Sequence, residues 1–252
     1  MSFTLRLTAD LTFALAARAL TKRRSSSPIL RLSADENLDL ASDSNATKTQ
    51  PAQILSPRHL SPIVWIGGPE PLDNFEVARL SNALAASGRH VFLETSGASL
   101  KPRLHEFRPS SRLYFVVRFN ALTQNHGGLD NPEDAFSIGL EAVRMSRLAG
   151  FFTCANLVFH TNTATTAVVN LHSEIRKLDI DGFLIAPAAL TPELEAQVHV
   201  ARHRFLTRRW ALLSSLLDQH ASDAHPRNSL ELSCESAPES QRNRFGEGVE
   251  AG

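Results

Sequence analysis

The apolar residues of the chain fall into short continuous runs, and these runs alternate with segments in which apolar positions recur at helical spacing. Bounded by turn residues and too short for helices, such runs are typical of strands covered on both faces. The predicted strands are PILRLSA, IVWIG, RHVFLETSG, RLYFVVRFNA, FFTCANLVF and DGFLIAPA. The predicted helices between them include NFEVARLSNALAASG, PEDAFSIGLEAVRMSRLAG and TTAVVNLHSEIRKLD, and Gly88 and Gly150 suit the C-terminal caps of the first two.

This alternation of strand and helix predicts an α/β fold with a parallel sheet, either a partial barrel or a doubly wound sheet. In both architectures ligands bind at the C-terminal ends of the strands. A last helical region, TPELEAQVHVARHRFLTRRWALLSSLLDQH, is expected to form two pieces.

Three segments lie outside this pattern. Residues 1–24 have apolar positions at roughly helical spacing and predict an amphipathic helix. The Ser-, Asn-, Asp- and Pro-rich stretch over about residues 42–61 is expected to be irregular, and residues 221–252 are expected to form a disordered tail. The main α/β domain is therefore placed at residues 28–217.

Composition narrows the classes of function. Lys plus Arg and Asp plus Glu both number 26, so the formal net charge of zero argues against a nucleic-acid-binding protein. The two cysteines, Cys154 and Cys234, cannot form a disulfide framework or a four-thiolate metal site. No apolar run reaches the length of a transmembrane segment. The N-terminus resembles a signal peptide only loosely, and a cytoplasmic location is expected.

The loop Gly67-Gly68-Pro69-Glu70-Pro71 is the first candidate for a site. Two adjacent glycines permit unusual backbone conformations and close approach by another group, and the prolines stiffen the exit. The loop follows a predicted strand, where a parallel sheet places its ligands. It could equally be a plain strand-to-helix turn, with Glu70 capping the helix that follows.

This loop resembles a motif of the radical SAM superfamily, and so does a second strand end, Leu93-Glu94-Thr95-Ser96-Gly97. The segments LKPRLHEFRPSSRLYFVVRFNALTQNH, DAFSIGLEAVRMSRLAGFFTCANLVF and LDIDGFLIAPA further resemble the hopanoid-biosynthesis members of that superfamily, the adenosylhopane synthase-like proteins. The resemblance implies a partial (βα)6 TIM-like barrel. It also implies a pocket for S-adenosylmethionine, in which the carbonyls of Gly67 and Gly68 receive the methionine amino group.

Such enzymes hold a [4Fe–4S] cluster on a CxxxCxxC loop, and here the resemblance fails. Glu36, Leu40 and Asp43 stand at the three ligand positions, in the segment ENLDLASD. Leu40 has no donor atom, and carboxylates are hard ligands that suit a soft cluster poorly. The crossover helix of the first βα unit, which the family has between residues 43 and 63, is also missing from the sequence pattern. At the end of the predicted strand RLYFVVRFNA, Asn120 stands where the family usually has an acidic residue. A [4Fe–4S] cluster is therefore not expected, and no catalytic or metal-binding residue is assigned.

The resemblance leaves Gly67, Gly68, Glu70, Glu94, Asn120 and Asn156 as candidate ligand-binding residues. Glu94, Asn120 and Asn156 lie near strand C-termini, although Asn156 needs hydrogen-bond partners in an apolar strand whatever its role. His199 and His203 have the i, i+4 spacing of metal ligands, but the adjacent arginines favour a solvated basic face.

Three hypotheses follow. The first is a degenerate radical SAM protein that binds a small molecule resembling S-adenosylmethionine, or a protein partner. The second is an active radical SAM transferase with unusual or partner-supplied cluster ligation. The third is a protein-interaction module that uses its N-terminal helix or its tail.

Overall fold

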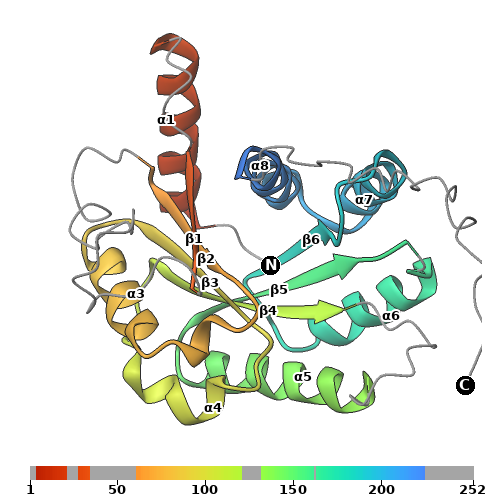
Figure 1. Cartoon of the computed structure of the whole chain (residues 1–252), viewed down its shortest axis with the longest axis horizontal. Coiled ribbons are helices and arrows are strands. Elements are labelled where there is room, and N and C mark those ends of the chain that lie inside the picture. The colour runs from red at the N-terminus through yellow and green to blue at the C-terminus, as the bar shows by residue number, and fades with distance from the viewer. Residues whose placement is uncertain (1–3, 22–27, 35–60, 121–131, 162, 225–252) are drawn as a thin grey trace, which may run out of the picture.

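The computed structural model describes residues 4–21, 28–34, 61–120, 132–161 and 163–224. Six parallel strands form one sheet in the order β1-β2-β3-β4-β5-β6. The strands are β1 (Ile29–Ser33), β2 (Ile63–Gly67), β3 (His90–Thr95), β4 (Leu113–Asn120), β5 (Phe152–Phe159) and β6 (Gly182–Pro187). The sheet curls into a half-barrel with helices on both faces (Figure 1), which confirms the predicted partial TIM-like barrel.

The helices follow the strands as the apolar spacing predicted. They are α1 (Leu5–Thr21), η1 (Pro71–Asp73), α3 (Glu76–Ala86), α4 (Leu100–Arg103), η2 (Leu104–Glu106), α5 (Pro132–Leu148), α6 (Thr165–Arg176), α7 (Pro192–Phe205) and α8 (Arg208–Ala224). Gly88 and Gly150 have φ angles of 94° and 84° after α3 and α5, as expected for helix C-terminal caps. The long C-terminal helical region is divided into α7 and α8, as predicted.

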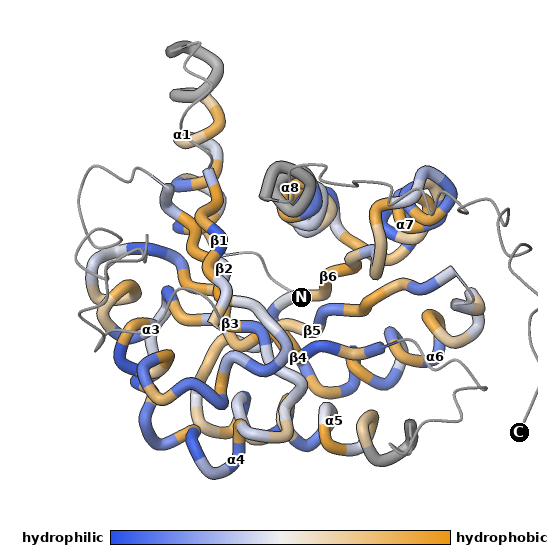
Figure 2. The backbone as a smooth tube through the Cα atoms, in the orientation of Figure 1, coloured by the Kyte–Doolittle hydropathy of each residue, from blue (hydrophilic) through white to orange (hydrophobic). Residues whose placement is uncertain are grey.

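Strand alternation divides the buried side chains into two clusters. On β3, for example, Val91 and Leu93 belong to the larger cluster, whereas Phe92 belongs to the smaller one. Helices α3, α5, α6 and α7 contribute to the larger, outer cluster, and α1 and α8 contribute to the smaller, inner one. The strands are largely apolar along their length, while helices such as α7 mix apolar and polar positions (Figure 2). The sheet is thus buried on both faces, as its near-continuous apolar runs indicated.

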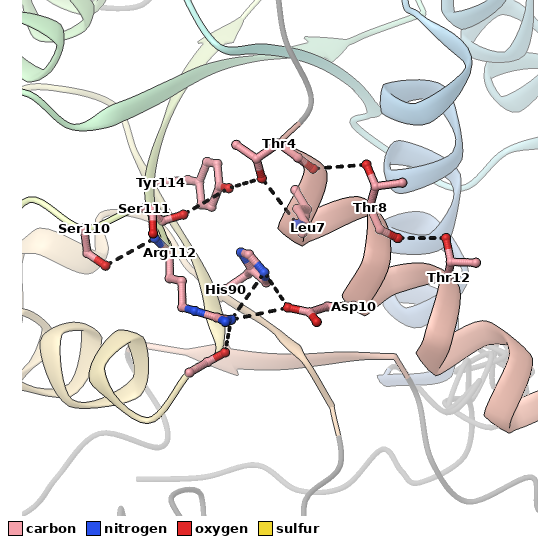
Figure 3. A network of polar contacts seen from close by, with 11 residues as sticks. Thr4, Leu7, Thr8, Asp10, Thr12, His90, Ser110, Ser111, Arg112 and Tyr114 are labelled. Carbon is pink, nitrogen blue, oxygen red and sulfur yellow. Dashed lines mark hydrogen bonds and ion pairs between the residues drawn. The ribbon is translucent and has the colours of Figure 1, made fainter.

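Helix α1 packs on the inner face through Leu7 and Leu11, which are 0% and 4% exposed. Its Asp10 carboxylate accepts hydrogen bonds from His90 Nε2 at 2.9 Å and Arg112 Nη1 at 3.3 Å, at the N-terminal ends of the strands (Figure 3). Asp10, which interrupts the apolar stretch of this helix, therefore anchors it to the sheet.

Several sequence-based boundaries can be compared only in part. Helix α8 continues to Ala224, beyond the predicted start of the tail at residue 221. The rest of the tail, the irregular stretch over residues 42–60, and Glu36, Leu40 and Asp43 lie outside the described residues. Within the described part of the chain, none of the helices combines the length and apolar character needed to cross a membrane.

Candidate functional site

The carboxylate of Glu70 joins the two predicted rim loops at the C-terminal ends of β2 and β3. Its Oε1 atom accepts hydrogen bonds from Thr95 Oγ1 at 2.8 Å and from the Leu72 backbone N–H at 3.3 Å. Its Oε2 atom accepts from the Ser96 backbone N–H at 2.8 Å and from the Ser96 hydroxyl. The structure thus brings the Gly67–Glu70 and Thr95–Gly97 loops together, as the sequence predicted.

Glu70 is also the N-cap of η1, with Pro71 at the first position of that short helix. Proline suits this position because its missing N–H would have no intrahelical partner and its φ angle is already helical. Glu70 therefore caps a helix, but this helix is the short η1 and not the predicted longer helix, α3, whose N-cap is Phe75. Both carboxylate oxygens are engaged within the protein.

The two glycines of the loop serve different purposes. Gly68 has a φ angle of 136°, which side-chain-bearing residues rarely adopt. Gly67 instead permits close approach, since a Cβ atom there would lie 3.1 Å from Trp65 Nε1 and 3.3 Å from Glu94 Oε2. The first glycine therefore leaves room for a polar contact beneath the loop, and the second shapes the turn.

The backbone carbonyls of the loop are all hydrogen-bonded within the protein. Gly67 O accepts from the Ala34 N–H at 3.0 Å. Gly68 O accepts from Arg118 Nη1 at 3.1 Å, and Pro69 O accepts from Arg118 Nη2 at 2.5 Å. The acceptors that the resemblance assigned to a ligand's amino group are therefore occupied by a main-chain amide and a guanidinium.

A buried polar contact lies on the inner face just below this rim. Glu94 is 9% exposed and accepts hydrogen bonds from Trp65 Nε1 at 3.3 Å and Asn156 Nδ2 at 3.1 Å. Asn156 is 5% exposed, and its Oδ1 atom has no hydrogen-bond partner among the described residues. An unsatisfied buried amide oxygen costs about 1–3 kcal/mol, so this atom is a free hydrogen-bond acceptor within the described structure.

Arg31 extends the polar contact toward the helix that covers the inner face. It lies on β1, and its Nη1 atom donates to the Leu217 carbonyl of α8 at 2.9 Å. Burial lowers the pKa of Arg31, while the carboxylates of Glu94 and Asp218 oppose that shift. We call Arg31, Glu94, Arg118 and Asn156 the inner polar group, because strand alternation places all four side chains on the face that α1 and α8 cover.

The predicted site residues are only partly brought together. Glu94 and Asn156 are in contact, and Gly67, Gly68 and Glu70 form the adjoining loop. Asn120 is at the end of β4 and is exposed. His199 and His203 pack against each other with ring centroids 4.5 Å apart. Within the described ranges, no three His, Cys, Asp or Glu side chains gather closely enough to hold a metal ion.

The residues of the described structure do not fit an iron–sulfur cluster. Cys154 is 0% exposed in the inner cluster, and burial raises the pKa of its thiol well above the usual range. Cluster ligands are thiolates, so this cysteine is unsuited to the role, and Cys234 lies outside the described residues. Two cysteines in the whole sequence also fall short of the three that such a loop supplies.

Sequence reasoning missed two members of the inner polar group, Arg31 and Arg118. Each interrupts an apolar strand pattern, in ILRLS and LYFVVRFN. A charged residue at an inward position of a strand buried on both faces is the signal that could have identified them, because such a charge needs a partner.

Comparison with known structures relates this fold to that of SuiB from Streptococcus suis. The structure of SuiB bound to S-adenosylmethionine matches with a TM-score of 0.51 and 15% identity over 84% of this chain and 51% of that chain. SuiB bound to its precursor peptide SuiA matches with a TM-score of 0.50 and 15% identity over 84% of this chain and 49% of that chain. An archaeal TYW1 structure matches with a TM-score of 0.43 and 10% identity over 71% of each chain.

This chain therefore spans about half the length of the SuiB chains that it resembles. No protein-family model matches the sequence, and comparison with curated proteins finds no related sequence. At these identities the likeness concerns the fold alone. The fold is a parallel six-stranded half-barrel similar to that of SuiB.

Proposed function

We propose that this chain is a member of the radical SAM superfamily that has lost its cluster chemistry and binds an adenosine-containing small molecule at the rim of the half-barrel. The observation that carries the proposal is the buried Oδ1 atom of Asn156, which has no hydrogen-bond partner among the described residues, while the Nδ2 atom of the same side chain donates to the Glu94 carboxylate. A hydroxyl or amino group of a nucleoside supplies the donor that this oxygen requires.

The fold supports this choice of ligand. SuiB, which shares the half-barrel at a TM-score of 0.51, is bound to S-adenosylmethionine in its structure. The C-terminal ends of parallel barrel strands are where such folds bind small molecules. Glu94 lies one residue before the end of β3, Asn156 lies in the middle of β5, and a hydrogen bond joins the two side chains on the inner face. Gly67 of the rim loop lies close to Glu94. The loss of cluster chemistry rests on the sequence, in which Glu36, Leu40 and Asp43 replace the three ligating cysteines.

Isothermal titration calorimetry with S-adenosylmethionine and 5′-deoxyadenosine tests the binding function. We expect the wild type to bind at least one of them and Asn156→Ala to lose about tenfold in affinity, because the bound donor would lose its buried acceptor. Asn170→Ala, an exposed asparagine on α6, is the matched control and should bind as the wild type does. No heat of binding from either nucleoside, or equal affinities in both variants, would contradict the proposal.

A protein partner is the second candidate, and exposed apolar residues on α1 favour it. Leu5 and Phe13 are 83% and 77% exposed on the helix whose other residues pack into the inner cluster. SuiB, by its structure, binds the precursor peptide SuiA. Light scattering over a range of concentrations tests self-association through this surface. We expect the wild type to associate and a Leu5→Ser/Phe13→Ser variant to remain monomeric; a monomeric wild type would exclude self-association.

A further inference from the structure

The side chain of Arg118 supplies a positive charge at the rim, next to the carbonyls of the Gly67–Glu70 loop. The side chain extends from β4, where Arg118 lies opposite Asn156 in the strand register. Its two terminal nitrogens donate to Gly68 O and Pro69 O, at 3.1 and 2.5 Å. The guanidinium group carries a positive charge and only donors, so it interacts with the loop as a cation.

The loop consequently offers few acceptors to a ligand. Gly67 O is occupied by the Ala34 N–H, and both oxygens of Glu70 accept hydrogen bonds from neighbouring groups. An incoming ammonium group would share these two carbonyls with the guanidinium and would meet a like charge at short range, which disfavours binding. By contrast, Asn156 Oδ1 can still accept a hydrogen bond from an uncharged hydroxyl or amino group.

We infer that Arg118 determines ligand specificity by occupying the loop carbonyls with an internal cation, so that the site selects neutral nucleosides over nucleosides carrying an amino acid group. This inference rests on the proposed nucleoside-binding function and narrows its ligand class. It assigns to Arg118 a positioning role toward the loop and a repulsive role toward an ammonium group.

Calorimetry with two matched nucleosides tests the inference. 5′-Methylthioadenosine and S-adenosylhomocysteine are both free of the sulfonium charge and differ in the amino acid group that only the second carries. We expect the wild type to bind methylthioadenosine at least about tenfold more tightly. Arg118→Met, which keeps the length of the side chain but removes its donors, should raise the affinity for S-adenosylhomocysteine and leave that for methylthioadenosine within about twofold.

Two further variants make the outcome specific. Arg118→Lys retains the cation and should keep the wild-type preference, whereas Arg144→Met, at an exposed position of α5, should change neither affinity. If Arg118→Met weakens S-adenosylhomocysteine binding, Arg118 recruits the carboxylate of the ligand and the inference is wrong, although nucleoside binding itself stands. If the wild type binds neither nucleoside, the proposed function and the inference both fail.

Discussion

At the scale of single residues, Glu70 shows how one carboxylate can determine the shape of a rim. Its two oxygens accept from the Thr95 hydroxyl, the Leu72 and Ser96 amides and the Ser96 hydroxyl. These bonds come from η1 and from the end of β3, which are separated by α3 in the sequence. The carboxylate therefore fixes the relative position of both loops without any contribution from a ligand.

Replacement of Glu70 by glutamine should destabilise the protein. Glutamine has an NH2 group in place of one carboxylate oxygen. The donors that bond to that oxygen in the wild type would face another donor, and at least one of them would lose its acceptor. We expect a loss of about 1–3 kcal/mol in the free energy of unfolding, measured by denaturant titration. Glu76→Gln on α3 is the control, because its ion pair with the exposed Arg79 is worth about 1 kcal/mol or less. Equal losses in the two variants would show that the Glu70 network is not special.

The buried His90 side chain should make the stability of the protein depend on pH. The ring is fully buried and its Nε2 atom lies 2.9 Å from Asp10 Oδ2, while Nδ1 has no partner among the described residues (Figure 3). If Nε2 carries the proton donated to Asp10, a second proton must bind Nδ1, where the described structure offers no acceptor. Burial is the main cause that lowers the pKa of His90 below its ordinary value of 6.5, and the hydrogen bond that the ring makes to Asp10 opposes this shift.

The unfolded chain should therefore bind more protons than the folded chain as the pH falls through 6.5. Stability therefore rises with pH in this range, so the contribution of neutral His90 is fully present above pH 6.5 and is lost as the pH falls below it. We expect the melting temperature to fall between pH 7.5 and 5.5, and to fall less in His90→Gln. His203→Gln, at an exposed position, should follow the wild type. An identical pH profile for wild type and His90→Gln would contradict this account.

The sequence predicted local side-chain contacts better than contacts between distant parts of the chain. A capping role for Glu70 was one of two interpretations available from the sequence, but the helix that it caps is η1 and not the longer helix predicted after the loop. The contacts of Arg118 with Gly68 and Pro69 could not be predicted, since they join β4 to a loop about fifty residues earlier in the chain. Pairings of this kind depend on which strands become neighbours and on where a long side chain turns.

At the scale of elements, the seating of α8 on the inner face depends on a glycine of β6. The ring of Trp210 packs directly over Gly182, and a Cβ atom at that position would lie 2.3 Å from ring atoms Cη2 and Cζ2. Trp210 is 1% exposed and belongs to the inner cluster with Leu213, Leu216 and Leu217. The close contact is possible only because residue 182 has no side chain.

Gly182→Ala should displace Trp210 and destabilise the protein by about 1–3 kcal/mol, as overpacking of a core does. Trp210→Phe removes the two ring atoms that would clash and leaves Cys154 Sγ, 2.8 Å from the Cβ position. The double variant should therefore lose less stability than the sum of the two single variants. Denaturant unfolding of the four proteins gives the coupling energy. Strict additivity of the two changes would mean that the alanine side chain is accommodated without contact with the tryptophan.

The succession of elements was largely predictable, whereas their boundaries and partners were less so. Apolar runs and helical spacing identified the strands and the main helices, because burial on both faces leaves a clear pattern in the sequence. The same pattern did not show that α1 and α8 would share the inner face, since an amphipathic helix specifies an apolar side but not the surface that covers it.

At the scale of the whole molecule, the strand order follows the order of the sequence. Each parallel connection therefore joins neighbouring strands, and the C-terminal ends of all six strands lie along one rim. The half-barrel leaves an inner face that α1 and α8 cover at its apolar part, while the inner polar group lies toward the rim. The location of the candidate site could thus be predicted from the fold class, whereas its individual hydrogen bonds could be identified only in the structure.

The proposed loss of cluster chemistry concerns the whole chain and can be tested as such. Two cysteines are available, and Cys154 is enclosed in the inner cluster, so three thiolates cannot be assembled from this chain. After anaerobic reconstitution with iron and sulfide, we expect no stable [4Fe–4S] cluster by iron and sulfide analysis and by visible absorption. Addition of dithionite and S-adenosylmethionine should release no 5′-deoxyadenosine above a control without protein.

A variant with cysteines at positions 36, 40 and 43 is the informative comparison, because it supplies the three thiolates in the same background. Cluster formation by that variant alone would attribute the loss to these positions. Release of 5′-deoxyadenosine by the wild type would instead favour an active enzyme with unusual or partner-supplied ligation.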